Sequence, residues 1–195
     1  MDRRKRRSRY HEEEIRHVIE AHGARPPAAD PPGGQRTRQA PDKAIRVGDR
    51  RSCVWRGPLA YAGAVHLGLV TLVVDDYDLA IAFFVAVLGF ELVEDSPSLT
   101  NDGRPKRWVV VRPPGAQTGL LLAQADGAEQ AAFVGTQAAG RVGFFLHVDE
   151  FSTAYTRMTS VGVRFITEPR TEPYGQVAVF LDVAGNKWDL IGPAA

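Results

Sequence analysis

Cysteine is almost absent from this sequence of 195 residues, because Cys53 is the single one. One cysteine excludes a disulfide within the chain and any metal site built from several thiolates. It also favours a reducing compartment, so we expect a cytoplasmic protein. No apolar run reaches the roughly 18 residues that a membrane-spanning helix needs. The stretch at 59–74 is too short, and His66 interrupts it, so we expect no association with a membrane.

Several common catalytic motifs are also missing. The sequence has no Gly-rich phosphate loop, no Gly-x-Ser-x-Gly nucleophile elbow and no His-Glu-x-x-His zinc motif. The usual sequence signs of nucleotide binding, of a serine hydrolase and of a zinc protease are therefore lacking. Nucleophilic catalysis by Cys53 is not expected either, because this residue lies outside the segment with a regular apolar pattern.

Positive charge is concentrated in the first third of the chain. Residues 1–65 carry a net charge of +7 and residues 66–195 carry −6. Residues 1–64 are also rich in proline and glycine, and such a composition buries too little apolar surface to offset the entropy of ordering. We therefore predict that residues 1–64 form a basic, disordered extension. Charge alone leaves open an arm for nucleic acid or an acidic partner, although no nucleic-acid motif supports it. A targeting segment is a third interpretation, against which the acidic residues 12–14 argue.

Residues 66–195 contain one pattern twice. Residues 69–93 and 142–166 each read as a strand, an acidic turn, an amphipathic helix and a second strand. An acidic residue before each helix is expected to accept backbone N–H groups, and Gly89 and Gly162 are expected to end the helices. A hairpin follows in each half. We therefore predict an α+β fold of two βαβββ modules that form an eight-stranded open barrel or cleft.

The predicted modules span residues 66–125 and 140–195, and a unit this small rarely folds alone. We expect the helices to cover the outer faces of the sheets. The inner faces are then left to form a cleft shared by the two modules.

The duplicated pattern resembles the vicinal-oxygen-chelate superfamily, which includes glyoxalase I, extradiol dioxygenases and bleomycin-resistance proteins. The resemblance covers residues 67–192. It rests on the acidic turn before a helix that ends in Leu-Gly-Phe at 88–90, and on the Asp-x-x-Gly-Asn hairpin at 182–186. It implies the fold above, a small-molecule ligand and a homodimer. It does not determine the chemistry, because one scaffold hosts many activities.

The resemblance also implies where a metal would bind. Members that use one supply a His, Glu or Gln ligand from the first and last strand of each module, and the metal polarises vicinal oxygens of the substrate. The corresponding positions are Leu69, Gly143 and Asp189, with Gln124 as the plausible donor of the fourth strand. One carboxylate does not hold a divalent cation against water. We therefore expect no metal and no other cofactor, with a divalent metal at a non-standard site as the alternative.

Strand alternation predicts which side chains line the cleft. A five-residue turn at 182–186 pairs Val179 with Asp189, so both face the cleft. A repeat offset of 70 residues places Arg107 on the same face. It directs Trp108, like Trp188, towards the helices.

The predicted cleft is mostly apolar with a few polar groups, which suits a small organic ligand. The proline-stiffened loop 169–175 is expected at its mouth. Catalytic residues stay undetermined, with Asp189 and His147 as candidates, and an ion pair between Asp189 and Arg107 is the purely structural alternative. The candidate ligand-binding residues are Thr71, Arg107, Phe145, Arg170, Glu172, Tyr174 and Asp189.

These observations predict a glyoxalase/bleomycin-resistance-like protein that binds a small organic molecule without the usual metal. The alternative is a metal-dependent lyase, isomerase or dioxygenase of the same superfamily with a non-standard site. A third hypothesis, an interaction protein directed by its basic arm, rests on residues 1–64 alone.

Overall fold

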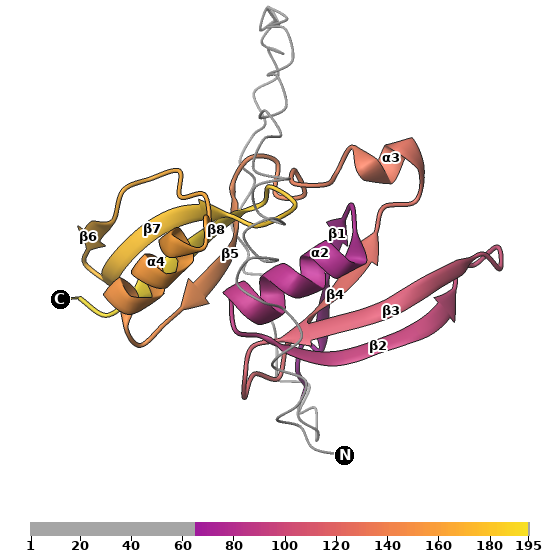
Figure 1. Ribbon diagram of the computed structural model, residues 1–195, viewed down its shortest axis with the longest axis horizontal. Helices are drawn as coiled ribbons and strands as arrows, with labels where there is room; N and C mark the ends of the chain where they lie inside the picture. Colours follow the sequence, from indigo (N-terminus) through magenta and orange to yellow (C-terminus); the bar gives the residue numbers. More distant parts are fainter. Residues whose placement is uncertain (1–64, 195) are drawn as a thin grey trace, which may run out of the picture. The chain divides into compact units, whose positions relative to one another are not determined.

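The computed structural model describes residues 65–194. Residues 66–194 belong to one unit, which contains two modules of sheet and helix (Figure 1). The predicted disordered extension, residues 1–64, lies outside the described residues. Within the described part of the chain, no helix is long and apolar enough to cross a membrane.

The first module is a four-stranded sheet with its helix after the first strand. The strand order is β1-β4-β3-β2; β1 runs parallel to β4, and the other neighbours are antiparallel. A short helix, α3, follows in the connection to the second module. The elements are β1 (Leu69–Val74), α2 (Tyr77–Ala82), the π-helical turn η2 (Phe83–Val87), β2 (Glu91–Leu99), β3 (Pro105–Arg112), β4 (Gly119–Gln124) and α3 (Gly127–Ala131).

The second module repeats this arrangement with the strand order β5-β8-β7-β6. Its parallel pair is β5 and β8. The predicted fold class is confirmed: residues 66–194 form an α+β structure of two βαβββ modules, whose sheets do not close into a barrel. The elements are β5 (Val142–His147), α4 (Phe151–Ser160), β6 (Arg170–Glu172), β7 (Gly175–Leu181) and β8 (Lys187–Gly192).

Acidic residues precede both long helices, but only one of them caps its helix. Asp76 accepts a hydrogen bond of 2.9 Å from the backbone N–H of Leu79, which has no partner inside the helix. Glu150 stands at the start of α4, and its side chain makes no capping hydrogen bond, so the prediction for this helix was wrong. Gly89 (φ 76°) and Gly162 (φ 90°) follow the two helices in a conformation that glycine adopts without strain, as predicted.

The second strand of the second module differs from the prediction. Residues 163–166 were expected to form a strand and 169–175 a loop. Only Phe165 forms a bridge to β7, and β6 lies within the predicted loop. The cause is Thr167, whose side-chain oxygen accepts the backbone N–H of Val179 at 2.8 Å and so interrupts the main-chain ladder. The ladder resumes at β6.

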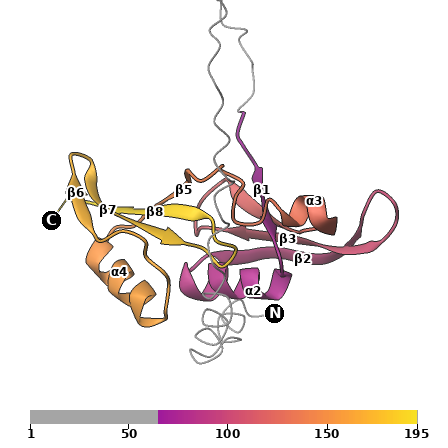
Figure 2. The same cartoon turned by 90° about the horizontal axis from the view of Figure 1, so that it is seen from above.

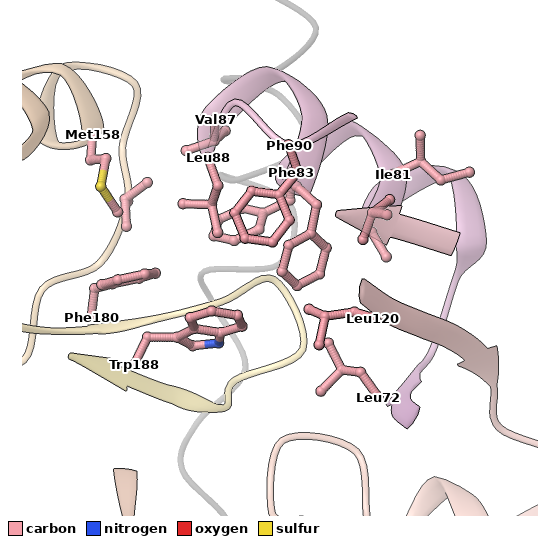
Figure 3. Close-up of a cluster of buried hydrophobic side chains, with 14 of the residues drawn as sticks. Leu72, Ile81, Phe83, Val87, Leu88, Phe90, Leu120, Met158, Phe180 and Trp188 are labelled. Atoms are coloured by element: carbon pink, nitrogen blue, oxygen red, sulfur yellow. The ribbon is translucent and has the colours of Figure 1, made fainter. Parts of the chain in front are cut away.

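Apolar side chains of both modules form one core on the helix-covered side of the sheets. The rings of Phe84 in η2 and Trp188 in β8 have centroids 5.8 Å apart. Figure 3 shows Trp188 and Phe180 directed towards the apolar side chains of η2. Arg157 of α4 donates a hydrogen bond to the carbonyl of Val87, at a helix end where carbonyls lack helical partners. The modules therefore share a core that neither could complete alone.

The other side of each sheet is not covered by its helix. Figure 2 shows α2 and α4 on the same side of the two sheets, and we call the opposite side the open face. Leu72 and Val74 belong to the core. Since side chains alternate along a strand, Leu69, Thr71 and Val73 lie on the open face of the first sheet.

Candidate ligand-binding face

The open face of the second sheet centres on Asp189 in β8. Asp189 lies opposite Val179 of the antiparallel neighbour β7 and level with Phe145 of the parallel neighbour β5. The pairing with Val179 agrees with the predicted register. Asp189 is only 9% exposed, whereas Phe145 is 60% exposed. A buried acid thus stands beside an aromatic ring that has most of its surface in solvent.

The carboxylate of Asp189 lacks the partners that a buried charge normally has. Its Oδ1 atom is buried, and no hydrogen-bond donor of the described residues reaches it. Burial raises the pKa of Asp189, and the nearby positive charge of Arg170 opposes this rise only in part. The site therefore contains an acid whose charged form is poorly compensated.

Two basic side chains near this acid are engaged elsewhere. Arg170 forms an ion pair with Glu172, with Nε 2.8 Å from the carboxylate oxygen. The Nζ atom of Lys187, on the strand of Asp189, donates to the carbonyl of Gly140 at 2.8 Å. Neither of these contacts neutralises Asp189, although both basic groups belong to the same module.

The remaining candidates of the second module lie around this acid. Arg170 and Glu172 belong to the short edge strand β6, and Tyr174, which is 62% exposed, lies in the turn between β6 and β7. His147 is exposed at the end of β5, level with Ile191 of β8. These positions place an aromatic ring, an acid and an ion pair in one module.

In the first module, Thr71 lies on the open face as predicted, and a connecting segment approaches its strand. The side-chain oxygen of Gln137 accepts the backbone N–H of Val73 at 2.8 Å. Its amide nitrogen lies 3.4 Å from the carbonyl oxygen of Thr71. Gln137 thus satisfies main-chain groups on the outer edge of β1, which protects this edge from pairing with another strand.

The structure contradicts the predicted position of Arg107. Its guanidinium group binds Asp95 at 2.7 Å and Asp78 of α2 at 2.8 Å. It also lies 5.2 Å from the ring centroid of Tyr77, within range of a cation–π contact. Arg107 therefore lies on the helix-covered side, and it does not pair with Asp189. Val109 and Val111, which alternate with Arg107 on the same face of β3, belong to the core as well.

The error arises from the length of one turn. The β3–β4 turn has six residues, 113–118, whereas the β7–β8 turn has five, 182–186. Aligning the two turns by their glycines shifted β3 by one residue, and a shift of one residue moves every side chain to the opposite face. Trp108 therefore lies on the open face, contrary to the prediction, while Trp188 faces the core as expected.

Sequence reasoning also missed the true counterpart of Asp189 in the first module. Asp189 is level with Phe145 in the β5–β8 pair. Leu121 is level with Thr71 in the equivalent β1–β4 pair. The side chain of Gln124, considered earlier, donates instead to the carbonyl of Asp75 at 2.9 Å. The signal that could have identified Leu121 is its alternation with the core residues of β4.

Comparison with known proteins agrees with this geometry. The family model of the Glyoxalase/Bleomycin resistance protein/Dioxygenase superfamily matches residues 66–190. The chain belongs to this superfamily. A protein of Shewanella frigidimarina is 50% identical over 123 residues, which are 63% of this chain and 89% of that protein.

Two solved structures of similar proteins support the assignment. UcmS2 is 32% identical with a TM-score of 0.55, over 66% of this chain and 98% of that one. TnmS3, described as an antibiotic binding protein from Streptomyces sp. CB03234, is 28% identical with a TM-score of 0.52. The alignment covers 67% of this chain and 98% of TnmS3.

The residues at the metal positions implied by the superfamily do not fit a divalent cation. Leu69, Leu121 and Gly143 have no side-chain donor atom, so Asp189 would be the one protein ligand from these four positions. Among residues 65–194, no three His, Cys, Asp or Glu side chains come close enough together to hold a metal ion. One carboxylate oxygen does not replace the hydration shell of such a cation.

Proposed function

We propose that this superfamily member binds a small organic molecule on the open face around Asp189 and Phe145, without a metal ion. The observation that carries the proposal is the exposed ring of Phe145 beside a buried acid, Asp189, which occupies one of the metal positions implied by the superfamily. A site of this kind presents apolar surface for contact area and one polar group for orientation.

The relatives support the same class of function. TnmS3, to which this chain is similar in sequence and fold, is described as an antibiotic binding protein. Sequestering a molecule requires affinity and no chemical step, which agrees with a face that offers one acid and a ring. Tyr174 and the Arg170–Glu172 ion pair at the edge of the sheet add further groups that a ligand would contact.

The proposal includes a homodimer. Within one chain, the modules build their common core on the helix-covered side, with Phe84 of the first against Trp188 of the second. Part of the open face stays exposed in one chain, and a second copy of this chain carries a matching apolar surface for it. Phe145 and Leu69, which are 60% and 39% exposed, would be covered by such a contact. We place the dimer in the cytoplasm, which the single cysteine favours.

A metal-dependent lyase, isomerase or dioxygenase is the alternative, and the residues at the metal positions do not favour it.

An experiment that separates the two functions is binding of acridine, a neutral aromatic molecule of three rings, to the full chain after treatment with a chelator. We expect saturable binding that the chelator does not abolish. We also expect Phe145→Ser to weaken it about tenfold, because a ring contact and its buried area are lost. Fluorescence titration at pH 8 measures both.

The matched control is Phe133→Ser. Phe133 is 55% exposed, close to the value for Phe145, but lies in the connection between the modules. Its substitution should leave acridine binding unchanged. Failure of the wild-type chain to bind either acridine or its charged analogues of the same size would contradict the proposed function, and binding that returns only when a divalent cation is added back would favour the metal-dependent alternative.

A further inference from the structure

Asp189 also indicates the chemical class of the ligand. A carboxylate that is nine-tenths buried normally has hydrogen-bond donors or a positive partner, because an uncompensated charge in such surroundings is costly. Its Oδ1 atom has no donor among the described residues. A molecule that binds on this face and carries a hydrogen-bond donor would supply the donor that the carboxylate lacks.

The nearby basic side chains do not occupy this role. Arg170 is held by Glu172, and Lys187 is held by the carbonyl of Gly140. The open face of the second sheet therefore keeps an acid to which no described basic group donates directly, with apolar Val179 on one neighbouring strand and the ring of Phe145 on the other. A hydrogen bond from a charged donor to a carboxylate is shorter and stronger than one between neutral groups.

Building on the function proposed above, we propose that the ligand is a cationic aromatic molecule. Its protonated nitrogen donates a hydrogen bond to the carboxylate of Asp189, whose residue keeps 9% of its surface exposed, and its flat apolar body lies against Phe145. The acid selects the charge of the ligand, and the ring supplies contact area that tolerates differences in shape. An anionic ligand would meet the same carboxylate with repulsion.

Three aromatic probes of similar size and different charge test this ligand class. At pH 8, 9-aminoacridine is a cation, acridine is neutral and 9-anthracenecarboxylate is an anion. We expect the wild-type chain to bind 9-aminoacridine at least about tenfold more tightly than acridine, and 9-anthracenecarboxylate most weakly. Equal affinities for the three probes, or a preference for the anion, would overturn the assignment of the ligand class.

Asp189→Asn then tests the residue, because it removes the charge and keeps the shape. We expect it to weaken binding of 9-aminoacridine about tenfold or more and to change that of acridine less than about twofold. Glu91→Gln, which removes one exposed negative charge from β2 of the first module, is the matched control and should leave both affinities unchanged. Unchanged cation affinity in Asp189→Asn would overturn the role of this acid.

The failure of this inference can be distinguished from failure of the proposed function. If acridine binds and charge makes no difference, the face binds aromatic molecules and the ligand class is wrong. If none of the three probes binds to the wild-type chain, the proposed function fails, and the inference fails with it. The wild-type measurements suffice for this decision, so it does not depend on whether any variant folds.

Discussion

At the scale of single residues, Asp189 costs the protein stability. Its carboxylate lies on an apolar face, and one oxygen lacks a hydrogen-bond donor of the described residues. Two other aspartates of the chain, Asp95 and Asp78, each form an ion pair with Arg107. A buried acid without such a partner lowers the stability of the fold, a cost that the proposed ligand contact would explain.

Replacing Asp189 by Asn should therefore stabilise the free protein at pH 7, by about 1 kcal/mol. The folded-state pKa of Asp189 is raised by burial, so the folded chain binds a proton here more readily than the unfolded chain. The contribution of Asp189 to stability consequently falls as the pH rises above its ordinary pKa, and recovers as the pH falls. The advantage of Asn should shrink as the pH approaches 4.

Thermal unfolding of both proteins between pH 4 and pH 8 measures this difference. Glu91→Gln serves again as the control and should follow the wild-type chain at every pH. A wild-type melting temperature equal to or above that of Asp189→Asn at pH 7 would show that the buried acid is compensated after all.

At the scale of elements, the β7–β8 turn fixes the position of Asp189. Asp182 is 5% exposed and accepts hydrogen bonds from the backbone N–H groups of Ala184 and Asn186. It also accepts a hydrogen bond of 2.9 Å from the indole nitrogen of Trp188. These hydrogen bonds join the turn to a core side chain. They fix the five-residue connection and with it the register of β7 and β8.

Asp182→Ala should destabilise the chain by about 3 kcal/mol, because it leaves several buried N–H groups without an acceptor. The midpoint of urea unfolding, followed by circular dichroism, measures the loss. Asp102→Ala is the matched control: Asp102 also lies in a hairpin turn but binds Arg104 at the surface, so the midpoint should hardly change. Equal effects of the two substitutions would mean that the buried network does not stabilise the turn.

The same turn shows how far the sequence predicts the site. Asp-x-x-Gly-Asn at 182–186 correctly predicted that Val179 pairs with Asp189. In the first module the extra residue of the β3–β4 turn was not recognised, so Arg107 was assigned to the wrong face. Local turn chemistry determines register, and repeat symmetry does not replace it. The lack of a described donor to Oδ1 of Asp189 was not predictable either, since it depends on where Arg170 points.

At the scale of the whole molecule, the repeat predicted two modules but not which faces bring them together. The expected cleft between inner faces of one chain stays a prediction, whereas the shared core lies on the helix-covered side. Trp188 of the second module contacts Phe84 of the first, and Arg157 binds a carbonyl at the end of η2. Apolar periodicity identifies which face of a strand is buried, but it does not identify the element that buries it.

If two copies cover each other's open faces, the wild-type chain should have a solution mass of twice 21.3 kDa. Phe145→Asp should then produce monomers, because it places a charge in an apolar contact. Phe133→Asp, an equally exposed aromatic position in the connection, should leave the dimer intact. Sedimentation velocity over a range of concentrations distinguishes these outcomes.

A wild-type monomer at every concentration would contradict the dimer. A dimeric Phe145→Asp variant would show that the dimer contact lies on another surface. In either case the ligand would have to bind without a contribution from a second copy, and its affinity would depend on the groups of one chain alone.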